Sequence, residues 1–161
     1  MEVSQLIQQL DLLPHPEGGF YKEVYRSPHF MKQEGFAGKR SVSTSIYYLL
    51  QAGDFSAFHR IKSDELWHFY SGGPLIVHML EEGKGYSYHL LGSPDTPGAV
   101  FQAVVPAYVW FASEPLEGTD YTLAGCTVAP GFDFADFELA HAASLLQQFP
   151  EQATLINRLC R

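Results

Sequence analysis

Basic residues are in short supply in this chain. Only 10 of its 161 residues are Lys or Arg, against 18 Asp or Glu, so the formal net charge at pH 7 is -8. Proteins that bind the phosphates of nucleic acids or an anionic membrane surface carry clusters of Lys and Arg. We therefore expect neither a nucleic acid nor a membrane among the partners.

Cysteines and long apolar runs are also few. Cys126 and Cys160, the two cysteines, lie far apart in the sequence. No run approaches the ~18 apolar residues that a membrane-spanning helix needs. Near the N-terminus no apolar stretch follows a basic segment, as it would in an export signal. We therefore expect reduced thiols and a cytoplasmic location.

Three catalytic motifs are missing as well. The sequence has no glycine-rich phosphate loop, no nucleophile elbow and no Cys-x-x-Cys pair. The chemistries that depend on these motifs are thereby set aside.

Apolar, aromatic and turn-forming residues, by contrast, are plentiful. Hydrophobic residues make up 46% of the chain and aromatic residues 14%, with 14 glycines and 10 prolines. This composition is typical of many short β-strands joined by tight turns. A chain of 161 residues is long enough for one substantial core. We therefore predict a single domain over residues 1–161.

The apolar pattern predicts helices at both ends and strands between them. Leu6, Ile7 and Leu10 recur at helical spacing, which predicts a helix over about 3–13. A barrel is predicted over about 19–139 and helices over about 140–160, with Pro150 opening the last one. Residues 28–40 show no period and are predicted to form a loop. The predicted strands cover 20–26, 41–50, 55–61, 66–70, 75–80, 86–91, 100–105, 108–112 and 121–128, and residues 132–139 alternate as if to begin another.

One stretch in the middle of the chain has a regular spacing of chemically distinctive residues. From Gly53 it reads glycine, five residues, His59, one residue, Ile61, three residues, Glu65, six residues, Gly72. This spacing resembles the first signature motif of the cupin superfamily. Ile61 stands where that motif has its second histidine, so half of the expected histidine pair is missing.

A second stretch departs from the cupin pattern in the same way. The second cupin motif reads Pro, any residue, Gly, two residues, His. Here Tyr108 replaces the glycine and Phe111 replaces the histidine, after Pro106. The framework of both motifs is present, but two of four metal-ligand positions are apolar.

Several blocks resemble a branch of the superfamily that has no established function. The resemblance implies an all-β fold, the double-stranded β-helix or jelly-roll barrel, with one cavity and with homodimerisation; it implies no reaction. The blocks lie between residue 15 and about residue 139 and read His15–Tyr21, Ser45–Tyr47, Phe58–Arg60, Asp64–Phe69, Val105–Phe111 and Gly125–Phe132.

Strand alternation, together with this resemblance, predicts the site. Alternate side chains share a face of a strand, and the resemblance places the faces of His59 and Glu65 toward the cavity. A carboxylate facing an apolar cavity needs a partner, and we predict that His59 is the partner of Glu65. The residues predicted to contact a planar or sugar-like ligand around this pair are Tyr47, Ile61, Trp67, Phe69, Tyr108 and Phe111.

Metal binding at this pair is an open alternative. Structural and catalytic zinc or iron sites use three or four protein ligands, and the motifs supply only His59 and Glu65. A weakly bound divalent ion would need a third donor, such as His78 or a tyrosine. We therefore expect no tightly bound metal and no other cofactor.

Three functions remain on the sequence alone. The first is binding of a small molecule around His59 and Glu65 without a tight metal. The second is a metal-independent sugar or nucleotide-sugar epimerase or isomerase, with His59 as general base and Glu65 orienting its ring. The third is a metal-dependent enzyme with an atypical ligand set. Whether the chain is an enzyme is left open.

The segment from Glu17 to Tyr21 has two interpretations. It follows the breakers Pro14 and Pro16 and contains Gly18 and Gly19. These glycines either let the chain pass close to the cavity mouth or to a partner subunit, or form a tight turn between helix and strand.

Overall fold

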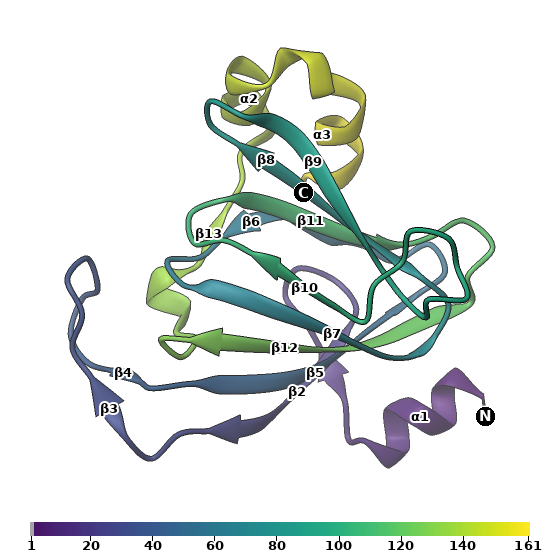
Figure 1. Ribbon diagram of the computed structural model, residues 1–161, viewed down its shortest axis with the longest axis horizontal. Helices are drawn as coiled ribbons and strands as arrows, with labels where there is room; N and C mark the ends of the chain where they lie inside the picture. The colour runs from purple at the N-terminus through teal and green to yellow at the C-terminus, as the bar shows by residue number, and fades with distance from the viewer. Residues whose placement is uncertain (1) are drawn as a thin grey trace.

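Two antiparallel sheets pack face to face in the computed structural model, which describes residues 2–161 (Figure 1). The larger sheet has the strand order β1-β2-β5-β12-β7-β10. Its strands are β1 (Leu13–Pro14), β2 (Phe20–Arg26), β5 (Thr44–Gln51), β12 (Tyr121–Ala129), β7 (Asp64–Gly72) and β10 (Gln102–Val105).

The smaller sheet has the order β13-β6-β11-β8-β9, and a separate hairpin pairs β3 with β4. The strands cross from one sheet to the other along the chain, so that β5, β6 and β7 lie in the large, small and large sheet in turn. The strands outside the larger sheet are β3 (Phe30–Met31), β4 (Arg40–Ser41), β6 (Ser56–Arg60), β8 (Leu75–Glu81), β9 (Gly85–Leu91), β11 (Trp110–Pro115) and β13 (Glu138–Leu139).

Short helices lie at both ends of the chain. Figure 1 shows α1 beside the large sheet and α2 and α3 at the opposite end of the molecule, beyond the small sheet. The helical segments are α1 (Val3–Gln9), α2 (Ala142–Gln148), α3 (Ala153–Leu159) and the 3-10 turns η1 (Phe134–Asp136) and η2 (Pro150–Gln152). No helix within residues 2–161 has the length and apolar character to cross a membrane.

Three apolar clusters hold these layers together. The first fills the interior between the sheets and includes Leu50, Trp67 and Phe111. The second packs Phe58 and Trp110 of the small sheet against the C-terminal helices, and the third packs the outer face of the large sheet against α1. Because β5 contributes to both the first and the third cluster, its side chains are buried on both faces of the sheet.

The predicted fold class is confirmed, with local differences. The protein is mainly β, of the jelly-roll type, with short helices at both ends. The first helix ends at Gln9 instead of near residue 13, because Asp11 adopts a left-handed φ of 51° and turns the chain into β1. Residues 28–40 are not only loop, since they contain β3 and the start of β4. The alternating residues 132–139 form η1 before β13.

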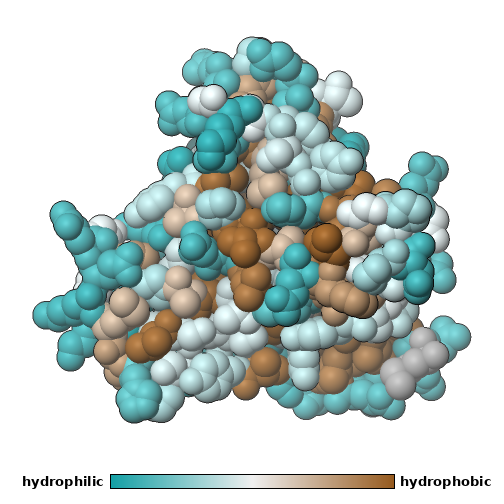
Figure 2. Space-filling model, viewed as in Figure 1, coloured by the Kyte–Doolittle hydropathy of each residue, from teal (hydrophilic) through white to brown (hydrophobic). Residues whose placement is uncertain are grey.

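Figure 2 shows where hydrophobic residues reach the surface on one face of the molecule. The β3–β4 hairpin and the C-terminal helices are mostly hydrophilic on this face, whereas hydrophobic residues gather over its middle, where β10 lies. Phe101 and Val104, in and next to β10, are both exposed.

Candidate functional site

A cavity of about 660 Å³ opens between the large sheet and the β6 side of the molecule. Strands β2, β5, β12 and β7 form one wall, and β6 with the 132–134 segment forms the other. The inner walls are largely apolar, and the ionisable residues among them are few. Those at the inner end are His15, Glu17, His59 and Glu65, and those nearer β2 and the 132–134 segment are Lys22, Glu23, Arg26 and Asp133.

The segment before β2 carries Glu17 into this cavity. Its backbone is pinned on both sides, since the Glu17 carbonyl accepts a hydrogen bond from the Ala57 N–H and the Gly18 carbonyl accepts one from the Tyr48 hydroxyl. Gly18 has φ of 116°, and a Cβ at this position would lie 2.1 Å from the Phe55 carbonyl oxygen. Only glycine fits such a backbone at such close approach. The first interpretation of this segment, passage close to the cavity, is therefore the one that the structure shows.

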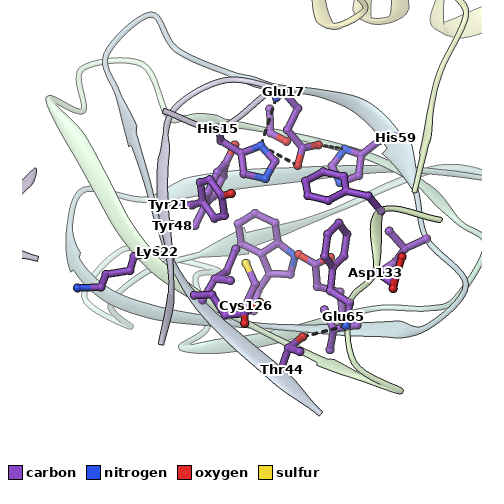
Figure 3. A pocket seen from close by; sticks show the side chains of 18 of the residues that line it. His15, Glu17, Tyr21, Lys22, Thr44, Tyr48, His59, Glu65, Cys126 and Asp133 are labelled. Carbon is purple, nitrogen blue, oxygen red and sulfur yellow. Dashed lines mark hydrogen bonds and ion pairs between the residues drawn. The ribbon is translucent and has the colours of Figure 1, made fainter. Parts of the chain in front are cut away.

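Glu17 is the residue that pairs with His59. His59 Nδ1 lies 2.7 Å from Glu17 Oε2, and both side chains are buried. The same Nδ1 lies 2.7 Å from the Ala57 carbonyl oxygen, to which its N–H donates. Glu17 Oε2 therefore lies against the ring as a counter-charge but has no hydrogen-bond partner among residues 2–161. On its other side, Glu17 Oε1 lies 3.1 Å from His15 Nδ1 (Figure 3).

Charge decides the protonation of this pair. Burial opposes ionisation of both groups, but their mutual attraction outweighs it: the pKa of Glu17 is lowered and the pKa of His59 is raised. Burial lowers the pKa of His15, despite the nearby Glu17. At neutral pH the pair is therefore an ionised carboxylate against an imidazolium, beside a neutral His15.

Glu65 behaves differently from Glu17. Figure 3 shows it on the far side of the cavity from the Glu17–His59 pair. It is buried and forms no ion pair with any residue in the described range 2–161. Burial raises its pKa to about 7, with Glu17 adding to the effect, while His59 and the Cys126 thiol oppose it. Glu65 is thus poised to gain or lose a proton near neutral pH.

The basic residues that line the cavity are already paired. Lys22 Nζ lies 3.0 Å from Asp11 Oδ2. Arg26 donates two hydrogen bonds of 2.8 Å to the Glu23 carboxylate and a third, of 3.1 Å, to the Phe132 carbonyl oxygen. The last contact ties β2 to the 132–134 segment, which closes one side of the cavity.

Comparison with known proteins identifies the family. Residues 4–140 match the family described as Cupin superfamily (DUF985). The chain belongs to this family. It is also 32% identical to an uncharacterized protein of Saccharomyces cerevisiae, over 94% of this chain and 82% of the yeast protein.

Solved structures agree with this assignment over the whole chain. A hypothetical protein from Leishmania major has 32% identity and a TM-score of 0.91, with 99% of each chain covered. A protein from Shewanella oneidensis has 35% identity and a TM-score of 0.89, covering 100% of this chain and 98% of the other. The protein is therefore a cupin of a family whose function is not established.

Four of the residues predicted from the cupin motifs lie where the cavity is. His59, Ile61, Glu65 and Trp67 all line it. The structure does not pair His59 with Glu65 directly, however, because Glu17 occupies the place next to the imidazole. Strand alternation predicted which side chains face inward, but not which segment would supply the counter-charge.

Phe69 and Phe111 lie near the cavity without lining it. Phe111 is fully buried, and its ring centroid lies 4.1 Å from that of His59 and 6.4 Å from that of Trp67. Phe69 packs against the interior cluster further along β7. Phe111 therefore supports the imidazole from behind, in the place where the cupin motif has a histidine.

The prediction that Tyr47 and Tyr108 line the cavity is wrong. On β5 it is Thr44, Ile46 and Tyr48 that face inward, so Tyr47 points to the opposite face, where it contacts the cluster under α1. Tyr108 precedes β11 in a turn with φ of 66° and is exposed. It keeps the left-handed backbone of the motif glycine that it replaces, which directs its side chain outward.

The residues present do not fit a cupin metal site. Ile61 and Phe111 supply no donor atoms, and His59 Nδ1 already faces Glu17 and the Ala57 carbonyl. His78, considered as a third donor, is turned away from the cavity toward Tyr86 and Glu114. Among residues 2–161 no three His, Cys, Asp or Glu side chains are grouped to hold an ion.

Glu17 and His15 are the site residues that the sequence prediction missed. Their signal was present in the sequence, because a charged residue followed by two glycines inside a proline-rich turn indicates a backbone held at close approach. The motif spacing, which extends from Gly53 to Gly72, does not reach this segment.

Proposed function

We propose that this cupin binds a small organic molecule in its interior cavity without a tightly bound metal. The observation that carries the proposal is the set of buried ionisable groups, Glu17, His59 and Glu65, on the wall of a 660 Å³ cavity. Burying charged groups costs free energy, and a protein that needed only a stable core would be served equally well by apolar residues at these positions. The volume suits a metabolite-sized ligand.

The test compares wild-type protein with two matched variants. His59→Gln changes a buried histidine that lines the cavity, and His78→Gln changes a buried histidine that does not. Protein is purified without a chelator or histidine tag, extracted with organic solvent, and the extract is analysed by mass spectrometry. In parallel, a metabolite library is screened by thermal shift.

We expect a compound that raises the melting temperature of wild type and of His78→Gln, but not of His59→Gln. A compound that stabilises all three proteins equally would place binding elsewhere and contradict the proposal. Elemental analysis of the same samples tests the metal-dependent alternative: stoichiometric metal in wild type, lost in His59→Gln, would replace our proposal with a metal site of atypical ligands.

A second candidate function is proton transfer to and from a bound substrate, as in a sugar or nucleotide-sugar epimerase or isomerase. It is favoured by the two protonatable groups, the Glu17–His59 pair and Glu65, on different sides of one cavity. Since Glu17 raises the pKa of His59, Glu65 is the better base and His59 the better acid at neutral pH. Such an enzyme incorporates solvent deuterium into its product; incorporation that survives in both Glu65→Gln and His59→Gln would rule it out.

A cytoplasmic homodimer completes the proposal. Val24 and Tyr25 are exposed on β2, and large exposed apolar side chains are typical of contacts between subunits. Light scattering of the purified protein gives the mass of the assembly, and a mass equal to one chain would contradict the dimer.

A further inference from the structure

The ionised groups at the inner end of the cavity do not balance. Glu17 and Glu65 are two carboxyl groups, and His59 is one imidazolium, whose charge is matched by Glu17 at 2.7 Å. His15 adds no charge, because burial lowers its pKa. When Glu65 is ionised, this end of the cavity therefore lacks one positive charge.

Nearby cations of the protein do not supply that charge. Lys22 is paired with Asp11 and Arg26 with Glu23. Arg40 is buried against Asp136, and Arg60 pairs with Glu138 and lies over the ring of Trp110. Asp133, which also lines the cavity, adds a further acidic group near its opening.

Aromatic rings line the cavity between these acidic groups. Tyr48 and Trp67 meet edge to face, with centroids 5.9 Å apart, on the wall formed by the large sheet. Tyr21, Phe132 and Phe134 line the cavity as well. Faces of aromatic rings attract cations, most strongly when water is excluded, and cages of such rings recognise organic ammonium groups.

We propose that the ligand of this cavity is an organic cation, a molecule whose ammonium group pairs with Glu65 while its apolar or planar part lies against the aromatic walls. The inference rests on the proposed function, since it names the chemical class of the molecule bound there. A bound ammonium group completes the charge balance that the protein leaves open. The formal net charge of -8 also favours the approach of a cation over that of an anion.

Three probes of similar size and different charge test this inference. Benzylamine (as the benzylammonium ion), benzyl alcohol and benzoate are each titrated into wild-type protein at pH 7.5, with binding followed by calorimetry and by the indole N–H signals of the two tryptophans. Trp67 is in the cavity wall and Trp110 is in the cluster against the C-terminal helices, so only the Trp67 signal is expected to move. A Trp110→Phe variant assigns the two signals.

We expect benzylammonium to bind on the order of tenfold more tightly than benzyl alcohol, and benzoate not to bind. In Glu65→Gln the advantage of the cation disappears while benzyl alcohol binds as before. Glu114→Gln is the matched control, because Glu114 is a partly buried carboxylate outside the cavity; it should leave all three affinities unchanged.

The outcomes separate this inference from the proposed function. Equal binding of benzyl alcohol and benzylammonium, or tightest binding of benzoate, overturns the organic cation and leaves a binding cavity. A preference for the cation that persists in Glu65→Gln also overturns the inference. A Trp67 signal that none of the probes moves overturns the cavity as a binding site, and the inference with it.

Discussion

Two buried histidine–glutamate pairs lie in different parts of this molecule and differ in every respect but composition. In the cavity, His59 Nδ1 lies 2.7 Å from Glu17 Oε2. On the outside of the small sheet, His78 Nε2 lies 2.9 Å from Glu114 Oε1, and its Nδ1 lies 2.9 Å from the Tyr86 hydroxyl. Arg158 of α3 binds the same glutamate through both of its terminal nitrogens.

The outer pair is satisfied, and the inner pair is not. His78 uses both ring nitrogens, and Glu114 is shared between His78 and Arg158, so this cluster attaches a C-terminal helix to the sheet. Glu17 Oε2 has no hydrogen-bond partner in residues 2–161, although it is buried. Buried polar groups without partners are rare in native proteins and call for an explanation. The comparison indicates that the outer pair is structural, whereas the inner pair is kept for a ligand.

Truncating each histidine should break this comparison most strongly. His59→Ala leaves Glu17 buried beside no cation other than a neutral His15, whereas His78→Ala leaves Glu114 with Arg158. Loss of one partner of a buried pair costs about 3 to 5 kcal/mol, so we expect the free energy of unfolding to fall by about 2 kcal/mol more in His59→Ala. Urea unfolding measures both; an equal loss would mean that Glu17 needs no counter-charge.

Removal of the charge on Glu65 sharpens the contrast between acids inside and outside the cavity. Folding raises the pKa of Glu65 to about 7, so its contribution to stability is present below pH 4.5 and is lost as the pH rises toward 7. Above pH 7 the loss is roughly 3 kcal/mol. We therefore expect Glu65→Gln to be more stable than wild type at pH 8 and unchanged near pH 4.

The control for this measurement is Glu114→Gln. Burial opposes ionisation of Glu114, but Arg158 and His78 outweigh it and lower its pKa. Its stabilising effect is therefore present at neutral pH and lost in acid, the reverse of Glu65. A Glu65→Gln variant that is less stable than wild type at pH 8 would contradict our account of the cavity.

The two histidines should titrate in opposite directions, an effect on the order of 1 kcal/mol per pKa unit. Glu17 outweighs burial and raises the pKa of His59, so its stabilisation is present at low pH and lost as the pH rises through the folded pKa. Burial lowers the pKa of His78, so its contribution is present above pH 6.5 and lost as the pH falls. NMR titration of the imidazole signals tests both, and the same direction for the two would be inconsistent with the pairing described.

The smallest expected effect concerns the two tyrosines outside the cavity. Tyr108 has φ of 66°, a conformation that costs a non-glycine residue about 1 kcal/mol. Tyr108→Gly should therefore gain a little stability, measured by thermal unfolding, and Tyr47→Phe should be close to neutral. Neither variant should change the affinity for benzylammonium; a change in either would show that the ligand reaches beyond the cavity.

The prediction from sequence succeeded where local periodicity controls structure. Strands such as β2 and β12 were predicted to within a residue of their ends, because alternating side chains and flanking turn residues mark them. The same alternation placed His59, Ile61, Glu65 and Trp67 on inward faces. It failed on β5, where both faces are buried and the apolar pattern does not distinguish Tyr47 from Tyr48.

The sequence by itself determined the fold class and the inward faces of β6 and β7, because strand periodicity and motif spacing are local properties of the chain. Only the tertiary structure decided that Glu17 pairs with His59 and that Glu65 has no partner. Those contacts depend on the close approach of the Gly18–Gly19 backbone to strands that follow much later in the chain. Counter-charges are chosen by distance in space, to which spacing along a sequence is blind.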